Sequence, residues 1–167
     1  GRDGSCRRVS RSIPGSPDRG ERPLAVARTL GEDVAMAHAA AFDDVRRVVA
    51  DFGPRATVIT VADSLRPHVV TAVVGVDSES LVIDVGAGSR ANLAAHPGLA
   101  LVWNPPGGGE YQLILDGTAA HIGEPDARGV STVRIAVAGG ILHRLAGLPD
   151  GAPSCRSLAE SSGSDGA

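Results

Sequence analysis

The chain has 167 residues, a length that suits one domain, and 43% of them are hydrophobic, enough for a buried core. A formal net charge of −3 and an aromatic content of 2% argue against general nucleic-acid binding, which relies on basic patches and aromatic stacking. No apolar run approaches the roughly 20 residues that span a bilayer, so we expect no membrane segment and a cytoplasmic protein.

The two ends of the chain differ in composition from the middle. Residues 1–35 and 147–167 are rich in Gly, Pro, Ser and Arg and lack sustained apolar periodicity. Such segments bury too little apolar surface to offset chain entropy, so we predict that both are disordered and that residues 36–146 form the domain. Met36 is the only methionine, which suggests that translation starts there and that residues 1–35 are a leader absent from the native protein.

The domain is predicted to begin with an amphipathic helix followed by a meander of strands. Apolar residues recur at helical spacing from 42 to 52, and Gly53-Pro54 ends the pattern. Segments rich in β-branched residues follow at Arg55–Ala62, Pro67–Val76 and Leu81–Val85. The turns between them are short, whereas a parallel crossover needs a dozen or more residues, so the strands are predicted to be antiparallel.

A short helix and three further strands complete the predicted domain. The helix spans Ser89–His96, with Ser89 as its cap and Pro97 as its stop. The strands are expected at Leu99–Trp103, Glu110–Ile122 and Val130–Val137, and Gly139-Gly140 is expected to break the last of them before Ile141–Leu145. The pattern predicts a mainly β (α+β) fold, a six-stranded antiparallel β-barrel with short helices.

The junction between the third strand and this helix carries the clearest chemical signal. Gly86-Ala87-Gly88 lets backbone N–H groups approach a ligand, and a helix start favours negative charge. Ser89 adds a hydroxyl, and Arg90 can hold a phosphate through two parallel hydrogen bonds. The junction therefore indicates a phosphate site, although a plain turn with a capped helix and a solvated arginine would use the same residues.

Two other nucleotide-binding motifs are similar to this junction, and we reject both. Gly86-x-Gly88-x-x-Ala91 fits a dinucleotide fingerprint, but that motif needs a strand–helix–strand unit and an acidic residue about 20 residues after it. Here the strands form hairpins, and Asn104 stands at that distance. Asp84–Gly88 with Asn104-Pro105-Pro106 resembles methyltransferase motifs, but such an enzyme needs far more chain between the two.

Other chemistries find little support in the sequence. No two histidines are four residues apart, so no zinc site is predicted. No serine lies in a nucleophile elbow, and no cysteine lies within the predicted barrel, which argues against a hydrolase. Trp103 and Tyr111 flank a Pro-Gly loop and are expected either to pack at the barrel rim or to border a substrate cleft.

Residues 42–145 resemble the pyridoxamine 5′-phosphate oxidase-like family of FMN-binding split barrels, most closely its small actinobacterial members. The resemblance rests on five segments in order, ATVITV, RPHVVTAVV, LVIDVGAGSRANLAAHPGLALVW, YQLILDGTA and ILHR. It implies a split β-barrel that forms a homodimer, with FMN bound between the two subunits and a small molecule as substrate.

The resemblance also implies which residues bind the cofactor. These are His68, Val69, Val70, Thr71, Asp84, Val85, Ser89, Arg90 and Gln112. The first four lie on a strand that would run along the flavin, mostly through backbone groups, and the next two would lie beside the ring and ribityl chain. Ser89 and Arg90 match the family's phosphate-binding Ser-Arg pair, and Gln112 matches a glutamine that often reaches the flavin from the other subunit.

The chain departs from the family pattern at two cationic positions. Ala91 stands where a phosphate-binding lysine often follows Ser-Arg, and Val73 stands where the flavin-lining strand often carries a basic residue. A true pyridoxamine phosphate oxidase is therefore not expected. The resemblance implies an FMN-dependent oxidoreductase, in which the cofactor carries the chemistry and no acid–base residue is assigned. A reductase that uses a deazaflavin coenzyme and a non-catalytic flavin-binding module are the alternatives.

Overall fold

The predicted first helix is present over residues 42–52 in the computed structural model, which describes residues 42–149 and 151–158. The elements that follow it are β1 (Arg55–Val61), β2 (Pro67–Val76), β3 (Leu81–Val85), α2 (Ala87–Ala95), β4 (Gly98–Trp103), the 3₁₀ turn η1 (Pro106–Gly108), β5 (Tyr111–Ile122), β6 (Ser131–Arg144) and β7 (Cys155–Ser157). The predicted bounds of β2 and β3 are confirmed, and those of β1, β4 and β5 differ by one residue.

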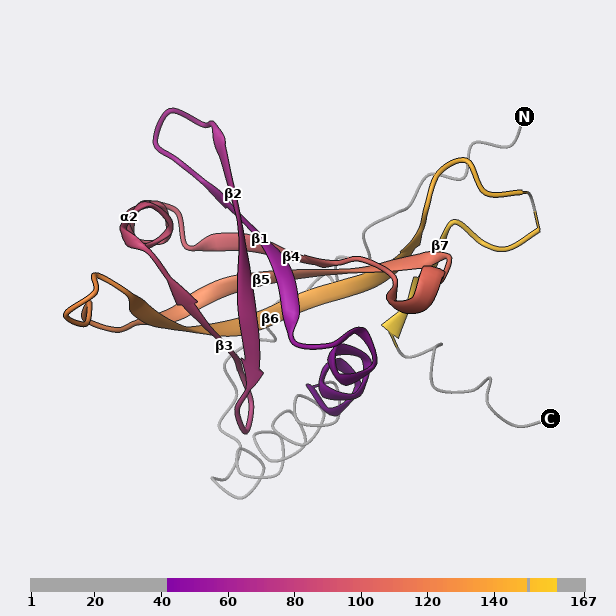
Figure 1. Ribbon diagram of the computed structural model, residues 1–167, viewed down its shortest axis with the longest axis horizontal. Helices are drawn as coiled ribbons and strands as arrows, with labels where there is room; N and C mark the ends of the chain where they lie inside the picture. The colour runs from indigo at the N-terminus through magenta and orange to yellow at the C-terminus, as the bar shows by residue number, and fades with distance from the viewer. Residues whose placement is uncertain (1–41, 150, 159–167) are drawn as a thin grey trace, which may run out of the picture.

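The strands form one antiparallel sheet that closes on itself. Their order is β3-β2-β1-β4-β5-β6-β7, and an additional pairing of β3 with β6 closes the first six strands into a barrel (Figure 1). The closing register runs from Leu81 opposite Ile135 to Val85 opposite Ser131. On its other side β3 pairs with β2 over Val74–Val76. The predicted six-stranded antiparallel barrel is therefore confirmed.

The core fills the barrel with alternate side chains of its strands. In β3 and β4 every second residue is buried, as expected for strands with one face against the core. The helix over residues 42–52 adds Phe42, Val45, Val48 and Val49 to the same core. Burial of this apolar surface is the main stabilising contribution to the fold.

Trp103 joins the end of the first helix to the barrel. The indole is 1% exposed, and its Nε1–H donates to the carbonyl of Gly53 over 2.9 Å. Gly53 has a φ of +88°, a left-handed conformation that favours glycine at the end of a helix. Tyr111 is half-buried and donates its hydroxyl to the Pro153 carbonyl over 2.9 Å. Trp103 was expected to pack at the barrel rim or to border a substrate cleft, and it is instead a buried core residue.

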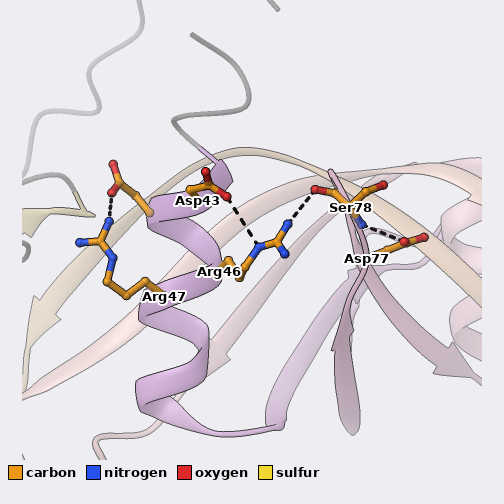
Figure 2. Close-up of polar contacts among 6 residues, drawn as sticks. Asp43, Arg46, Arg47, Asp77 and Ser78 are labelled. Carbon is orange, nitrogen blue, oxygen red and sulfur yellow. Dashed lines mark hydrogen bonds and ion pairs between the residues drawn. The ribbon is translucent and has the colours of Figure 1, made fainter. Parts of the chain in front are cut away.

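Polar contacts join the first helix to the turn between β2 and β3. Figure 2 shows Arg46 between Asp43, 3.8 Å away, and the carbonyl of Ser78, to which Arg46 Nη2 donates over 2.8 Å. Asp77 accepts a hydrogen bond from the Ser78 N–H and another from Arg134. These two hydrogen bonds lower the pKa of Asp77 below its usual value. The turn is thus tied both to the helix and to β6.

The expected break at Gly139-Gly140 is wrong, since β6 runs through both glycines. A Cβ on Gly140 would overlap Leu115 Cδ2 and lie 3.1 Å from the Ile114 carbonyl oxygen, so glycine lets β5 and β6 approach closely. The register of the two strands shifts here, from Asp116 opposite Gly139 to Gly117 opposite Val137. The glycines thus accommodate a bulge within one long, bent strand.

The predicted disorder of residues 147–167 does not hold for β7. Strand β7 pairs with β6 from Ile141 opposite Ser157 to His143 opposite Cys155. The guanidinium of Arg156 lies over the ring of Tyr111, 4.6 Å from its centroid. The sequence pattern misses this strand because its stabilising contacts come from residues far away in the chain. Residues 1–35 and Met36 lie outside the described residues.

Leu65 adopts a backbone conformation that leucine rarely takes. It ends the β1–β2 turn with a φ of 61° and is 77% exposed. A left-handed conformation costs an L-residue roughly 1–2 kcal/mol, and this leucine recovers little by burial. We expect Leu65→Gly to raise the free energy of unfolding by about 0.5–1 kcal/mol, measured by urea denaturation. Ser64 does not have a positive φ, so Ser64→Gly should lower the free energy of unfolding. A Leu65→Gly variant that is less stable than the unchanged protein would contradict this account.

Candidate functional site

The amino end of α2 has free backbone donors and no side-chain cap. Gly86 is the N-cap residue, with φ −78° and ψ 177°, and the first turn holds no acidic residue. The first backbone hydrogen bond runs from the N–H of Arg90 to the Gly86 carbonyl over 3.0 Å, so the N–H groups of Ala87, Gly88 and Ser89 have no partner within the helix. Such a terminus favours an anion.

Ser89 does not cap the helix, which corrects the expectation from the sequence. It is the third helical residue and is 2% exposed. The cap position falls on Gly86 because the chain is still extended there and turns helical at Ala87. Ser89 can therefore contribute its backbone N–H to an anion, while its side chain packs inward next to Leu93, one turn further along.

Arg90 contains a buried donor without a partner. Its Nε is shielded from solvent and makes no hydrogen bond. Side chains of a helix lean back toward its amino end, so the Cα–Cβ bond of Arg90 is directed toward the first turn. Leaving a buried charged donor unpaired is costly, and a bound anion would satisfy it. The arginine and the free N–H groups thus point to one negatively charged ligand.

Two contacts one helical turn apart hold α2 across the barrel. Asn92 Nδ2 donates to Thr60 Oγ1 over 3.0 Å, and Thr60 is fully buried in β1. His68 lies directly opposite Thr60 in the β1–β2 register. A Cβ on Gly88 would lie 3.5 Å from His68 Nε2, so Gly88 rests against that ring. The helix therefore lies against β1 through Asn92, and its amino end lies near the His68 ring of β2.

One edge of β2 is open along the predicted flavin-binding segment. Hydrogen bonds from Val74 N–H to the Pro54 carbonyl and from Ala62 N–H to the Arg66 carbonyl show that even-numbered residues of β2 bond toward β1. Because the two sides alternate along a strand, Val69, Thr71 and Val73 direct their N–H and C=O groups away from β1. Within the described residues β3 pairs only with Val74–Val76, and the Val74–Ile83 pairing engages the carbonyl of Val73, so the backbone groups of Val69 and Thr71 are the ones left unpaired by strands.

The same alternation divides the predicted contacts of β2. Backbone groups of Val69 and Thr71 lie on the open edge, whereas those of His68 and Val70 bond toward β1. The side chains of Val69 and Val73 are 57% and 64% exposed and form an apolar surface on the outer face of β2. Only half of this predicted segment can therefore offer backbone groups to a ligand, and its valines add apolar contact area.

Asp84 and Val85 end β3 just before α2 and point to opposite faces. Asp84 is exposed, and its carboxylate accepts a hydrogen bond from Thr132 Oγ1 over 2.7 Å. Val85 is buried in the core, so only its backbone can contact a ligand. The carboxylate of Asp84 is thus held by β6, next to the junction.

Gln112 lies at the other end of the barrel from this junction. It is opposite His143 on β6, whereas Val85 is opposite Ser131 at the start of the same strand. At about 3.3 Å per residue, on the order of 40 Å of strand separates the two β6 positions. In Figure 1 α2 lies at the left and β7, which pairs with His143, lies at the right. One chain therefore does not bring Gln112 to Arg90.

Thr60 of β1 and the imidazole of His68 in β2 lie against α2, and neither contact was predicted from the sequence. Neither Thr60 nor the imidazole of His68 carried a sequence signal of its own. The only usable hint was the four-residue spacing of Gly88 and Asn92, which places both on one face of the helix.

None of the described helices is long and apolar enough to cross a membrane.

Comparison with known proteins gives structural neighbours only. No family model matches the chain, and no curated protein matches it. A structure named F420 reductase is 16% identical, has a TM-score of 0.47, and its match covers 54% of this chain and 91% of its own.

Two further neighbours have different names. A pyridoxamine 5′-phosphate oxidase-related, FMN-binding protein from Nostoc punctiforme is 15% identical with a TM-score of 0.47, and the match covers 69% of this chain and 84% of that one. A heme-binding protein from Mycobacterium smegmatis is 16% identical with a TM-score of 0.49, over 68% and 56% of the two chains. The Nostoc punctiforme neighbour carries the name of the family that the sequence resembles.

Proposed function

We propose that this chain is an FMN-binding oxidoreductase that acts on a small molecule. The observation that carries the proposal is the buried, unpartnered Nε of Arg90, the fourth residue of a helix whose amino end has no side-chain cap. Together they offer one cation and several backbone donors to a phosphate group. The sequence resemblance independently assigns the phosphate to the same residues.

The residues present fit a flavin that carries a phosphate. The phosphate would lie at the first turn of α2, held by Arg90 and the N–H groups of Gly88 and Ser89. The ring would lie along the open edge of β2, where Val69 and Thr71 offer unpaired backbone groups and Val69 offers exposed apolar surface. When bound, the flavin supplies hydride and electron transfer. The chain's own residues bind and orient it, and no acid–base residue is assigned.

The proposal includes a homodimer. Because Gln112 lies at the far end of β6 from Arg90, it would meet the same cofactor only from a second copy. The exposed valines of β2 offer apolar surface that a second copy would bury. Measuring the mass in solution by light scattering tests this part of the proposal, and a monomer that binds FMN fully would contradict it.

Arg90→Ala is expected to weaken FMN binding about tenfold to a hundredfold. This is the loss of a charge-assisted hydrogen bond, worth roughly 1.5–3 kcal/mol. Quenching of flavin fluorescence on titration with protein measures the dissociation constant. Arg47→Ala is the matched control, because it removes the same charge from the first helix, where Arg47 is paired with Asp44. An Arg90→Ala variant that binds FMN as tightly as the unchanged protein would refute the phosphate assignment.

The same titration also tests the two alternatives, a deazaflavin coenzyme in place of FMN and a non-catalytic flavin-binding module. A protein that binds a deazaflavin coenzyme but not FMN would be assigned to the deazaflavin reductases, since the phosphate of either coenzyme would use Arg90. If FMN binds, addition of NAD(P)H followed by an electron acceptor tests turnover. Binding without reduction by NAD(P)H would favour a flavin-binding module that lacks this activity.

A further inference from the structure

Asp84 and Val73 lie where β2 and β3 separate. Val74 and Ile83 form the last pair of the two strands on the side of α2, and both are buried. Val73 and Asp84 are the next residues, and both are exposed, so their side chains point to the outer face of the barrel. In Figure 1 the two strands diverge from the turn that joins them, and β3 leads to α2. Asp84 therefore stands where the open edge of β2 begins, two residues before the Gly86 cap.

The carboxylate of Asp84 is held in place from β6. Thr132 lies opposite Asp84 in the β3–β6 register, and its Oγ1 donates a hydrogen bond to Asp84 Oδ1 over 2.7 Å. Within the described residues the other oxygen, Oδ2, has no hydrogen-bond partner. Arg134, two residues further along β6, is paired with Asp77 instead. One oxygen thus orients the group, and the other is available to a ligand.

Asp84 is the one formally charged side chain of β2 and β3. The other side chains of these strands are apolar, apart from the His68 imidazole and the Thr71 hydroxyl. A ligand that lies beside the point of separation therefore meets an anion and no cation on either strand. An anionic ligand group is repelled there, whereas a cationic group can donate a charge-assisted hydrogen bond to Oδ2.

We propose that the substrate of the flavin site is a small organic cation, whose charged group is bound by Asp84. This inference rests on the proposed function, which places the flavin ring along the open edge of β2, and it adds the class of substrate. Anionic molecules such as phosphate esters are disfavoured, because Arg90 is engaged by the flavin phosphate and neither strand supplies another cation. The carboxylate binds and orients the substrate and takes part in no bond change.

Benzamidine and benzoate are matched probes of this proposal, because both are small flat molecules and their charges are opposite. Perturbation of the flavin absorption spectrum on titration of the FMN-loaded protein gives the dissociation constant of each probe. Benzamidinium is expected to bind about tenfold more tightly than benzoate. Asp84→Asn should remove most of that preference, as expected for the loss of one charge-assisted hydrogen bond. Asparagine keeps an oxygen that can accept from Thr132, so the fold should be retained.

Asp51→Asn is the matched control for the loss of a charge. It removes the same charge from an exposed position of the first helix and should leave the preference for benzamidinium unchanged. If benzamidinium does not bind, or if Asp84→Asn prefers it as strongly as the unchanged protein does, with FMN bound by both, the role of Asp84 is wrong. In either case the proposed function stands.

An NMR titration of the protein without FMN distinguishes failure of the inference from failure of the proposed function. Benzamidinium should shift the backbone amide resonances of Asp84 and Thr132, and benzoate should not. The same shifts in a protein that does not bind FMN, with their loss in Asp84→Asn, would support the cation site and overturn only the flavin assignment. Absence of the shifts in a protein that also fails to bind FMN would overturn both proposals.

Discussion

Replacing Gly140 with alanine should destabilise the protein by about 1–3 kcal/mol, because the new methyl group has no room. Its Cβ would overlap Leu115 Cδ2 and lie 3.1 Å from the Ile114 carbonyl oxygen. The Leu115 side chain is fully buried and cannot move away freely, and the carbonyl belongs to the paired strand. Thermal unfolding followed by circular dichroism should show a fall in Tm of about 5–10 °C.

The neighbouring glycine provides the control for this prediction. A Cβ on Gly139 would meet nothing within 4 Å, so Gly139→Ala should change the Tm little or raise it slightly. If both substitutions had the same effect, the cause would be the backbone freedom of glycine rather than close packing between β5 and β6.

Trp103→Ala is expected to lower the free energy of unfolding by about 3–5 kcal/mol. The substitution empties a fully buried site in β4 and removes the donor to the Gly53 carbonyl. The barrel and the end of the first helix therefore lose a common contact. Urea denaturation followed by far-ultraviolet circular dichroism measures the effect without needing the tryptophan signal.

A second variant at the same position separates packing from hydrogen bonding. Trp103→Phe keeps much of the apolar volume but leaves the Gly53 carbonyl without its donor, so we expect a smaller loss of about 1–3 kcal/mol. Tyr111→Phe removes only the hydrogen bond to Pro153 and should cost less than either. A Trp103→Ala variant as stable as Tyr111→Phe would show that the indole is not part of the core.

Much of the barrel was predictable because its strands carry strong local patterns. The bounds of β2 and β3 are the predicted ones, since β-branched runs there end at short polar turns. The helix at 42–52 followed from apolar spacing and from Gly53-Pro54. Errors arose where a local signal has two meanings: Gly140 reads as a strand breaker, yet here it permits close packing within a continuous β6.

The candidate site divides in a similar way. Arg90 and the glycines before it are proposed as a phosphate site from residue types alone, because phosphate binding needs a cation and free backbone donors. The cap was assigned to Ser89, although the residue at which the chain becomes helical decides the cap, and that residue is Ala87. The resemblance placed the backbone of His68–Val73 along the flavin, and the strand register shows which of these residues face the open edge.

By itself, the sequence determined the kinds of elements, their order, the antiparallel barrel and the position of the glycine-rich junction before α2. These depend on periodicity, turn residues and charge, which are local properties of the chain. Only the tertiary structure decided that β7 pairs with β6, that Trp103 lies in the core, and that His68 stands beside Gly88. Each of these is a contact between residues distant in sequence, and its free energy exists only once both partners have been brought together.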